Sequence, residues 1–88
     1  MRHLFLVNPA AGKKDRTREY QARIATACKD LNYEILVSRQ PGDLTSWSRQ
    51  AAASGEALRI YACGPDGTLN EVVNGVVGFP NVSVTHFP

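Results

Sequence analysis

The amino-acid sequence predicts an α/β protein, a three-layer α/β/α domain built on a parallel sheet of about four strands. Two observations predict this class. Short apolar runs alternate along the chain with segments in which apolar residues recur at helical spacing, which is typical of right-handed βαβ units. The loops after the first three apolar runs hold most of the Gly, Pro and short polar residues. Ligands of such sheets lie beyond the carboxyl ends of the strands.

Length and composition set the first limits on function. With 88 residues, 43% of them hydrophobic and 20% charged, the chain is one small soluble domain or part of a larger protein. A net charge of +2 is too small to indicate a nucleic-acid partner. The basic residues gather in the first third of the chain, which suits either an anionic ligand or a solvated helix face.

The first half of the chain predicts two strands and a helix. Residues 4–7 form a wholly apolar run, as expected for a strand buried on both faces. From about residue 17 to 31 apolar residues recur at helical spacing, with Asp15 or Thr17 as the cap and Asn32 as the end. Residues 33–37 form the second predicted strand.

The second half repeats the alternation. Asp43 is expected to cap a helix that stops near Gly55, and residues 58–63 form the third strand. A third helix is expected from Thr68, because Thr68 and Glu71 fit a capping box. Residues 82–86 form the fourth strand. The predicted order is β-α-β-α-β-α-β, a Rossmann-like arrangement with an expected sheet order of 2-1-3-4.

The cysteines and the N-terminus indicate a cytoplasmic protein. Cys28 and Cys63 are far apart and do not have a metal-binding spacing, so we expect buried, reduced thiols. The apolar segment at the N-terminus has five residues or fewer and ends at Asn-Pro, which is too short for an export signal or a membrane span.

Residues 64–68 predict a strand that runs through a tight turn into a helix. Such a turn aims backbone N–H groups and the positive end of a helix dipole at the carboxyl edge of the sheet, where a phosphate could bind. The known phosphate fingerprints are not met: the Gly-Lys pair at 12–13 lacks the earlier glycine of a Walker loop. The residues alone therefore predict an edge that favours anions.

Three motifs resemble one protein family. Residues 64–75, Gly-Pro-Asp-Gly-Thr-Leu-Asn-Glu-Val-Val-Asn-Gly, resemble the Gly-Gly-Asp-Gly-Thr-Leu-Asn-Glu-Val-x-Asn-Gly signature of the diacylglycerol kinase-like family, which includes bacterial lipid kinases and sphingosine kinases. Residues 8–13 resemble its Asn-Pro-x-Ser/Ala-Gly motif. Ser38 and residues 41–43 match its segment after the second strand. The matches occur in the family's order and cover nearly the whole chain.

The resemblance implies an ATP site and a set of residues that form it. In the family, the glycine-rich loop and the Asn-Pro segment hold the nucleotide phosphates. Asp66 would act through Mg²⁺, because a bare carboxylate repels phosphate. The residues carried over by position, with Ser38 nearby and Glu71 in support, are Asn8, Ser38, Gly64, Asp66, Gly67, Thr68 and Glu71. From the residues alone, Thr68 and Glu71 could equally be helix caps, and Asp66 an ordinary turn residue.

One residue departs from the family signature. Pro65 stands where the family has its second glycine. Proline lacks an N–H group and fixes φ near −65°, so it removes a donor from the loop, although Pro-Asp-Gly still suits a type I turn. We expect the fold to survive and nucleotide binding to be weaker.

The resemblance also defines what this chain would contribute. It implies that residues 1–88 are the N-terminal nucleotide-binding lobe of a lipid kinase, and that a C-terminal β-rich lobe supplies the lipid pocket and the catalytic base. We therefore expect these residues to include no catalytic residue and to be inactive alone, to form a homodimer, and to meet lipid only through the other lobe, with peripheral membrane contact in the full-length protein. The alternative is a degenerate or stand-alone α/β domain with weak nucleotide binding or a protein-interaction role.

Overall fold

The computed structural model describes residues 1–10 and 14–88 and confirms the predicted fold. A four-stranded sheet has the order β2-β1-β3-β4, and its three strand pairs are all parallel. The strands are β1 (Arg2–Val7), β2 (Glu34–Val37), β3 (Leu58–Cys63) and β4 (Val82–Phe87). The helices are α1 (Thr17–Ala27), α2 (Asp43–Ala52) and α3 (Asp66–Val76).

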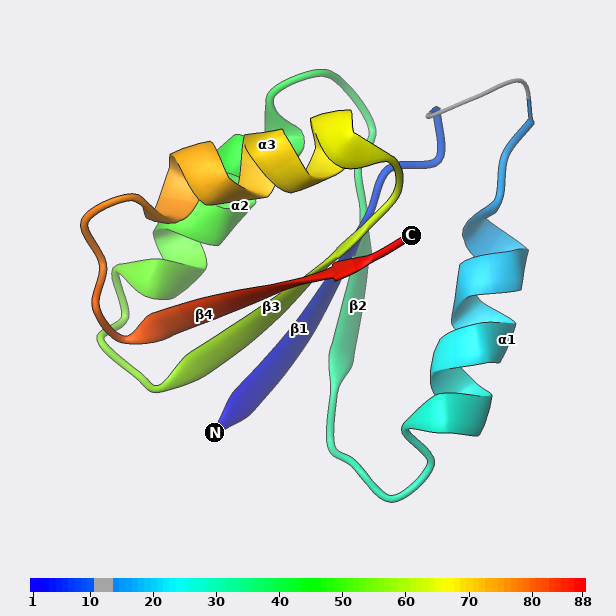
Figure 1. Cartoon of the computed structure of the whole chain (residues 1–88), viewed down its shortest axis with the longest axis horizontal. Helices are drawn as coiled ribbons and strands as arrows, with labels where there is room; N and C mark the ends of the chain where they lie inside the picture. The colour runs from blue at the N-terminus through cyan, green and yellow to red at the C-terminus, as the bar shows by residue number, and fades with distance from the viewer. Residues whose placement is uncertain (11–13) are drawn as a thin grey trace.

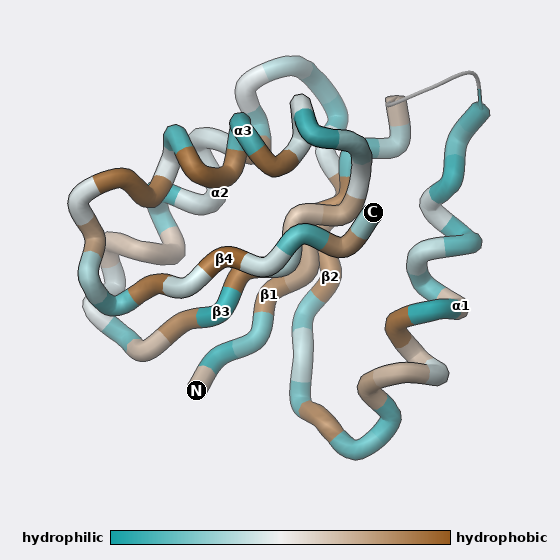
Figure 2. The backbone as a smooth tube through the Cα atoms, in the orientation of Figure 1, coloured by the Kyte–Doolittle hydropathy of each residue, from teal (hydrophilic) through white to brown (hydrophobic). Residues whose placement is uncertain are grey.

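The helices lie on both faces of the sheet, as a three-layer domain requires. Figure 1 shows α2 and α3 together on one face and α1 on the other. Side chains alternate along β1, so Leu4 and Leu6 join the core under α2 and α3, whereas Phe5 and Val7 join the core under α1. Apolar stretches run along β1, β3 and α3, while α1 is hydrophilic over much of its length (Figure 2). The wholly apolar run in β1 follows from burial on both faces.

The core under α1 is the smaller of the two. Tyr20 and Ile24 of α1 are its buried helix residues, and they pack with Phe5, Val7 and Cys63 of the sheet. Burial raises the pKa of the Cys63 thiol to about 12, against a small lowering by Arg23. Cys63 is therefore a neutral thiol. Both cysteines are free, and Cys63 is buried as expected, whereas Cys28 is only half-buried.

Two helix ends differ from the predictions. α1 ends at Ala27, not near Asn32, because the Cys28 N–H bonds to the Ile24 carbonyl at 2.8 Å and the Leu31 N–H then closes a turn on the Cys28 carbonyl at 2.9 Å. Asp43 is the first residue of α2, which leaves Gly42 as the N-cap.

The described helices, which exclude residues 11–13, are all too short or too polar to cross a bilayer.

A glycine brings α2 and α3 into close contact. Gly75 is buried, and a Cβ built on it would lie 2.6 Å from Ser48 Oγ and would also meet the Thr45 carbonyl. The Thr45 hydroxyl donates to the Glu71 carbonyl at 2.9 Å, which joins the first turn of α2 to the middle of α3. Gly75 therefore serves helix packing. This contact fixes the position of α3, whose first turn faces the site described next.

Candidate functional site

Three loops meet at the carboxyl edge of the sheet, as the parallel topology predicts. The strand register places Val7 level with Val37 and with Cys63, so Asn8, Ser38 and Gly64 all follow at the same edge. Backbone hydrogen bonds continue past the strands: the Ser38 N–H reaches the Val7 carbonyl at 2.9 Å and the Asn8 N–H reaches the Cys63 carbonyl at 3.2 Å. The first and third loops are thereby held side by side.

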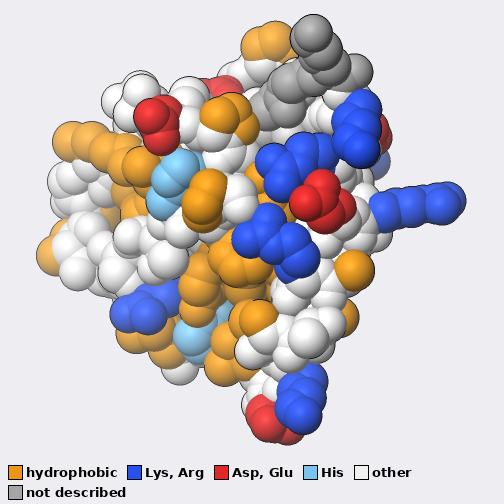
Figure 3. Space-filling view, turned by 45° about the vertical axis from the view of Figure 1, so that its right-hand side comes forward, with side chains coloured by type: hydrophobic (Ala, Val, Ile, Leu, Met, Phe, Trp, Pro, Cys, Tyr) orange, Lys and Arg blue, Asp and Glu red, His pale blue; other side chains and the backbone are white. Residues whose placement is uncertain are grey.

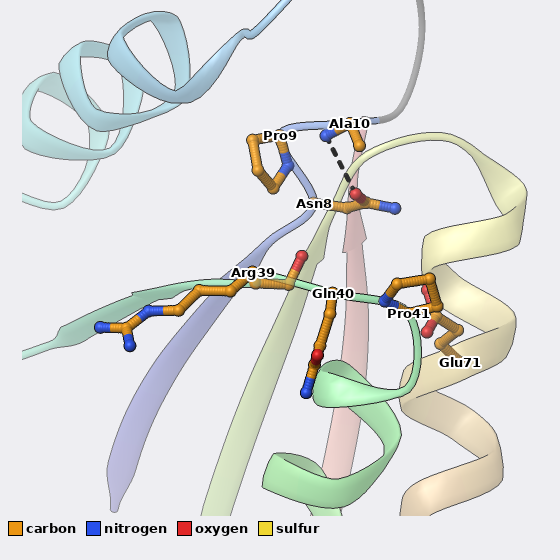
Figure 4. A pocket seen from close by; sticks show the side chains of 8 residues that line it. Asn8, Pro9, Ala10, Arg39, Gln40, Pro41 and Glu71 are labelled. Atoms are coloured by element: carbon orange, nitrogen blue, oxygen red, sulfur yellow. Dashed lines mark hydrogen bonds between the residues drawn. The ribbon is translucent and has the colours of Figure 1, made fainter.

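A cavity of about 310 Å³ opens between the first and second loops. Figure 4 shows Pro9 and Pro41 on its walls, with Glu71 approaching from α3. The Arg39 side chain extends away from Glu71, so this basic residue does not neutralise the carboxylate (Figure 4). Of the predicted site residues, Asn8, Ser38 and Glu71 line the cavity. The first motif continues into residues 11–13, which lie outside the described part of the chain.

Asn8 connects the first loop to α3. Its Oδ1 accepts a hydrogen bond from the Ala10 N–H at 3.1 Å, and its Nδ2 donates to Thr68 Oγ1 at 3.4 Å. Thr68 is 1% exposed, so its hydroxyl lies beneath the surface of the site. The structure therefore brings Asn8 and Thr68 together through a weak, partly buried hydrogen bond, in which the Thr68 hydroxyl oxygen accepts.

The glycine-rich turn has a different geometry from the predicted capping box. α3 begins at Asp66, and the Pro65 carbonyl accepts the Thr68 N–H at 2.9 Å. Thr68 therefore lies in the first turn and is not the N-cap, so the predicted capping box is wrong. Pro65 adopts φ −72° and ψ −176°, which suits an N-cap position and places no strain on proline.

The two glycines of the turn serve different purposes. Gly64 has φ +155°, and a Cβ there would lie 2.9 Å from Thr68 Cβ, so the fold itself requires glycine. Gly67 lies inside α3 without a positive φ, and a Cβ on it would meet nothing within 4 Å. Gly67 and its neighbour Asp66 are both exposed, so this stretch of α3 is open to a ligand.

Glu71 supports the second loop. Its Oε1 accepts a weak hydrogen bond from the Gly42 N–H at 3.4 Å. Asp43 completes the loop, because its Oδ2 accepts from the Arg39 N–H at 2.9 Å and the Gln40 N–H at 3.2 Å. The Asp43 carboxylate therefore organises the loop before α2. The sequence suggested a helix cap there, because both roles use the same residue type.

The fit of a divalent cation can be tested on the donor set. The described residues include no group of three or more His, Cys, Asp or Glu side chains that could hold a metal ion. Exposed Asp66 could supply one oxygen ligand. Mg²⁺ commonly binds through one or two carboxylates together with water and substrate phosphates, so this residue set fits a magnesium ion that arrives with a nucleotide.

Two basic residues on the α1 side of the molecule have partners within the chain: Arg16, the N-cap of α1, and Arg23 within α1. Figure 3 shows Lys and Arg side chains gathered on the α1 side of the molecule, next to an apolar strip. Arg16 pairs with Glu19 at 2.9 Å. Arg23 lies 4.6 Å above the Phe87 ring and donates to the Pro88 carbonyl at 2.8 Å. Of the two sequence-based interpretations, the solvated helix face describes these two residues better.

Sequence reasoning missed His86, which lies at the carboxyl end of β4. Its Nε2 lies 2.6 Å from the Gly64 carbonyl oxygen. A carbonyl can only accept, so Nε2 carries the proton. The parallel register, which pairs His86 with Ala62, could have indicated that it lies beside the glycine-rich turn.

The same architecture occurs in known proteins. The family profile described as "Diacylglycerol kinase catalytic domain" matches residues 2–88. The chain belongs to this family. The diacylglycerol kinase-like resemblance of the three motifs is thereby confirmed, and so is the identification of the chain as an N-terminal portion of the catalytic domain.

Individual proteins named as lipid or diacylglycerol kinases are similar to this chain in sequence and in fold. The protein named "Putative lipid kinase YtlR" from Bacillus subtilis (strain 168) is 26% identical over 87 residues, which are 96% of this chain and 28% of that protein. Two solved structures, a putative diacylglycerol kinase and a diacylglycerol kinase of Bacillus anthracis str. Sterne, superpose with TM-scores of 0.76 and 0.75 at 24% identity. Each superposition covers 99% of this chain and 30% of the other, so the chain spans less than a third of these relatives.

Proposed function

We propose that the chain is the ATP-binding part of a cytoplasmic lipid kinase, which transfers the γ-phosphoryl group of ATP to the hydroxyl of a diacylglycerol-like lipid. The observation that carries the proposal is the meeting of the Asn8, Ser38 and Gly64 loops at one sheet edge in a chain of the diacylglycerol kinase family. The α/β architecture alone would support many functions, so the proposal depends on this particular edge.

The proposed phosphate contacts are made by the start of α3. The described hydrogen bonds use the N–H groups of Thr68 and Leu69, which reach the Pro65 carbonyl at 2.9 and 3.4 Å. Asp66 and Gly67 come before them, and their N–H groups have no preceding turn of α3 to bond to, so they can point at an anion. Asn8 and Thr68 would hold this turn against the first loop, and Ser38 and Glu71 would border the nucleotide.

Magnesium is part of the proposal. Asp66 would hold it together with phosphate oxygens and water. When bound, the ion neutralises charge on the phosphates during transfer. The chain's own residues bind and orient the nucleotide: Asn8 fixes the first loop, and the exposed surface of Gly67 lets phosphate approach the helix. The lipid, the membrane surface and the base that accepts the hydroxyl proton belong to the remainder of the catalytic domain in this proposal, so the 88 residues alone would not phosphorylate lipid.

The proposal is tested by calorimetric titration of ATP with magnesium into the chain and into Gly67→Ala. Because a Cβ on Gly67 meets no protein atom within 4 Å, the variant should fold normally. We expect micromolar to millimolar binding by the native chain and at least a tenfold weaker affinity for Gly67→Ala. Equal affinities would place the nucleotide elsewhere, and no binding by the native chain would contradict the proposal.

Self-association stays a prediction. The exposed large apolar side chains of the described residues are Met1, Leu36, Val73 and Val77, and the last two lie four residues apart on α3 or just beyond it. A homodimer that covers them would be stabilised by burial of apolar surface. Light scattering should then give twice the mass of one chain; a single-chain mass at all concentrations would contradict the prediction.

A further inference from the structure

We propose that His86 is a positioning residue that sets the orientation of the glycine-rich turn, and so the direction of the N–H groups at the start of α3. This inference deepens the proposed ATP site and rests on it. His86 is the residue before the end of β4. Its side chain reaches the Gly64 carbonyl, with Nε2 and the oxygen 2.6 Å apart. Neither the predicted site residues nor the three family-like motifs include it.

The end of β4 holds Gly64 through both of its backbone polar groups. The Gly64 N–H donates to the Phe87 carbonyl at 3.3 Å, and the Gly64 carbonyl accepts from His86 Nε2. The peptide plane that follows Gly64 contains this carbonyl, so a bond to the oxygen fixes the rotation of that plane. Pro65 follows directly, and its own φ is restricted. The direction in which α3 starts is therefore determined at Gly64.

A second constraint acts on Gly64 from the opposite side. Its Cα lies against Thr68, where a Cβ would come within 2.9 Å of Thr68 Cβ. Thr68 in turn accepts a hydrogen bond from Asn8 Nδ2 at 3.4 Å. The turn is thus held between the first loop on one side and β4 on the other. Without the His86 bond, the Gly64 carbonyl would lose its partner in β4, and only the Thr68 contact would resist rotation of the peptide.

The chemistry of imidazole suits this role. Nε2 must carry a proton, because the carbonyl can only accept. Nδ1 can then be neutral or protonated without loss of the bond. The donor is also specific: a glutamine of similar reach presents an N–H group at a comparable position, whereas leucine fills similar space and offers no donor. These two substitutions separate the hydrogen bond from packing.

The test compares His86→Gln and His86→Leu by ATP titration with magnesium, by thermal melting and by amide hydrogen exchange of Thr68 and Leu69, whose N–H groups bond to the Pro65 carbonyl next to Gly64. His3→Leu is the matched control. His3 also makes one side-chain hydrogen bond, to the Tyr61 hydroxyl at 2.9 Å, but it lies near the start of β1, at the opposite edge of the sheet from the site. We expect His86→Leu to bind ATP five- to twentyfold more weakly and to exchange the Thr68 and Leu69 amide hydrogens faster. We expect His86→Gln to stay within twofold of the native chain in both measurements, and His3→Leu to leave both unchanged.

Two results would overturn the role of His86. One is native affinity and native exchange in His86→Leu. The other is an equal loss in the Leu and Gln variants in step with their melting temperatures, since that would show packing alone. If the native chain does not bind ATP, the proposed function fails by itself. The positioning role is then decided by exchange and by ¹H–¹⁵N spectra of the imidazole: a protected Nε2–H supports it, and a His86 ring protonated only at Nδ1 overturns it.

Discussion

At the scale of single residues, the glycine-rich turn separates two reasons for glycine. Gly64 has a positive φ and lies against Thr68, so the chain needs glycine there to fold. Gly67 meets neither condition. The sequence shows the same letter at both positions, and only the structure distinguishes a residue that the fold requires from one whose small size leaves room for a ligand.

Gly64→Ala should therefore destabilise the chain. The substitution forces an alanine into a backbone region that favours glycine and overlaps its Cβ with Thr68. Strain and overpacking of this kind each cost about 1–3 kcal/mol. Urea unfolding at pH 7 measures the loss. Gly67→Ala is the matched control, and it should keep or slightly raise the free energy of unfolding because alanine is the better helix former. Equal stability of the two variants would contradict this account.

Pro65→Gly addresses the departure from the family signature. The change adds an N–H group beside the proposed phosphate site, so ATP should bind more tightly, by about twofold or more. Proline at a compatible φ also stabilises by limiting the unfolded chain, so the variant should lose about 0.4–1 kcal/mol of unfolding free energy. Paired ATP titration and urea unfolding measure both effects. An affinity that is unchanged or lower in a folded variant would show that the missing donor is unimportant.

At the scale of secondary-structure elements, the α2–α3 contact and the β1–β2 edge carry separate predictions. Gly75 permits the close approach of the two helices. In Gly75→Ala, overpacking against Ser48 and the Thr45 carbonyl should outweigh the gain in helix propensity and cost about 1–3 kcal/mol. Asn74→Ala, an exposed change one residue earlier in the same helix, is the control. A Gly75→Ala variant as stable as this control, by thermal melting, would show that the helices can separate freely.

The β1–β2 edge predicts a dependence on pH. The Arg2 guanidinium bonds Glu34 at 2.8 Å, and this hydrogen bond holds the pKa of that carboxyl below its ordinary value of 4.5, although burial acts in the opposite direction. A lowered carboxyl pKa stabilises the folded chain above the ordinary pKa, and the gain is lost as pH falls through the folded pKa. The Glu34 side chain is 52% exposed, so the gain should be only about 0.5 kcal/mol.

Glu34→Gln tests this expectation by urea unfolding across the acid range. The free energy of unfolding of the native chain should exceed that of the variant at pH 7. The two values should converge at the acid end of the range in which both chains remain folded. Salt at 1 M should also reduce the difference at pH 7, because it screens exposed pairs. A difference that persists in acid would mean that the glutamine disturbs packing and that charge is not the cause.

At the scale of the whole molecule, one helix covers the smaller core, and Cys63 lies within it. A thiol with a pKa of about 12 is about one ten-thousandth ionised at pH 8, and the thiolate is the reactive form. A disulfide reagent should therefore modify half-buried Cys28 much faster than Cys63 in the native chain. In urea, which unfolds the chain, the reagent should modify both cysteines. Mass spectrometry of the labelled peptides resolves the two. Similar native rates would show that α1 opens readily from the sheet.

The sequence was sufficient for the architecture because the strands are short apolar runs buried on both faces. The expected sheet order 2-1-3-4 is also confirmed, although the alternation of strands and helices alone does not determine it, and the loops lie at the predicted edge. Local helix ends were less predictable, because Pro65 and Thr68 compete to start α3 and only tertiary packing decides between them. The role of His86 depends on a contact between β4 and the turn after β3, which a linear pattern does not contain. The bonds of Asp43 are local, but the same residue type serves a helix cap and a loop.

The bond between Asn8 and Thr68 joins residues 60 positions apart in the sequence. Closing such a long segment costs much chain entropy, and parallel pairing of β1 with β3 requires nearly as long a closure. The carboxyl edge of the sheet can therefore form only after β3 has been synthesised and has paired with β1. Assembly of this edge should be among the slowest steps of folding. A ligand that binds there would therefore bind only chains that have folded completely.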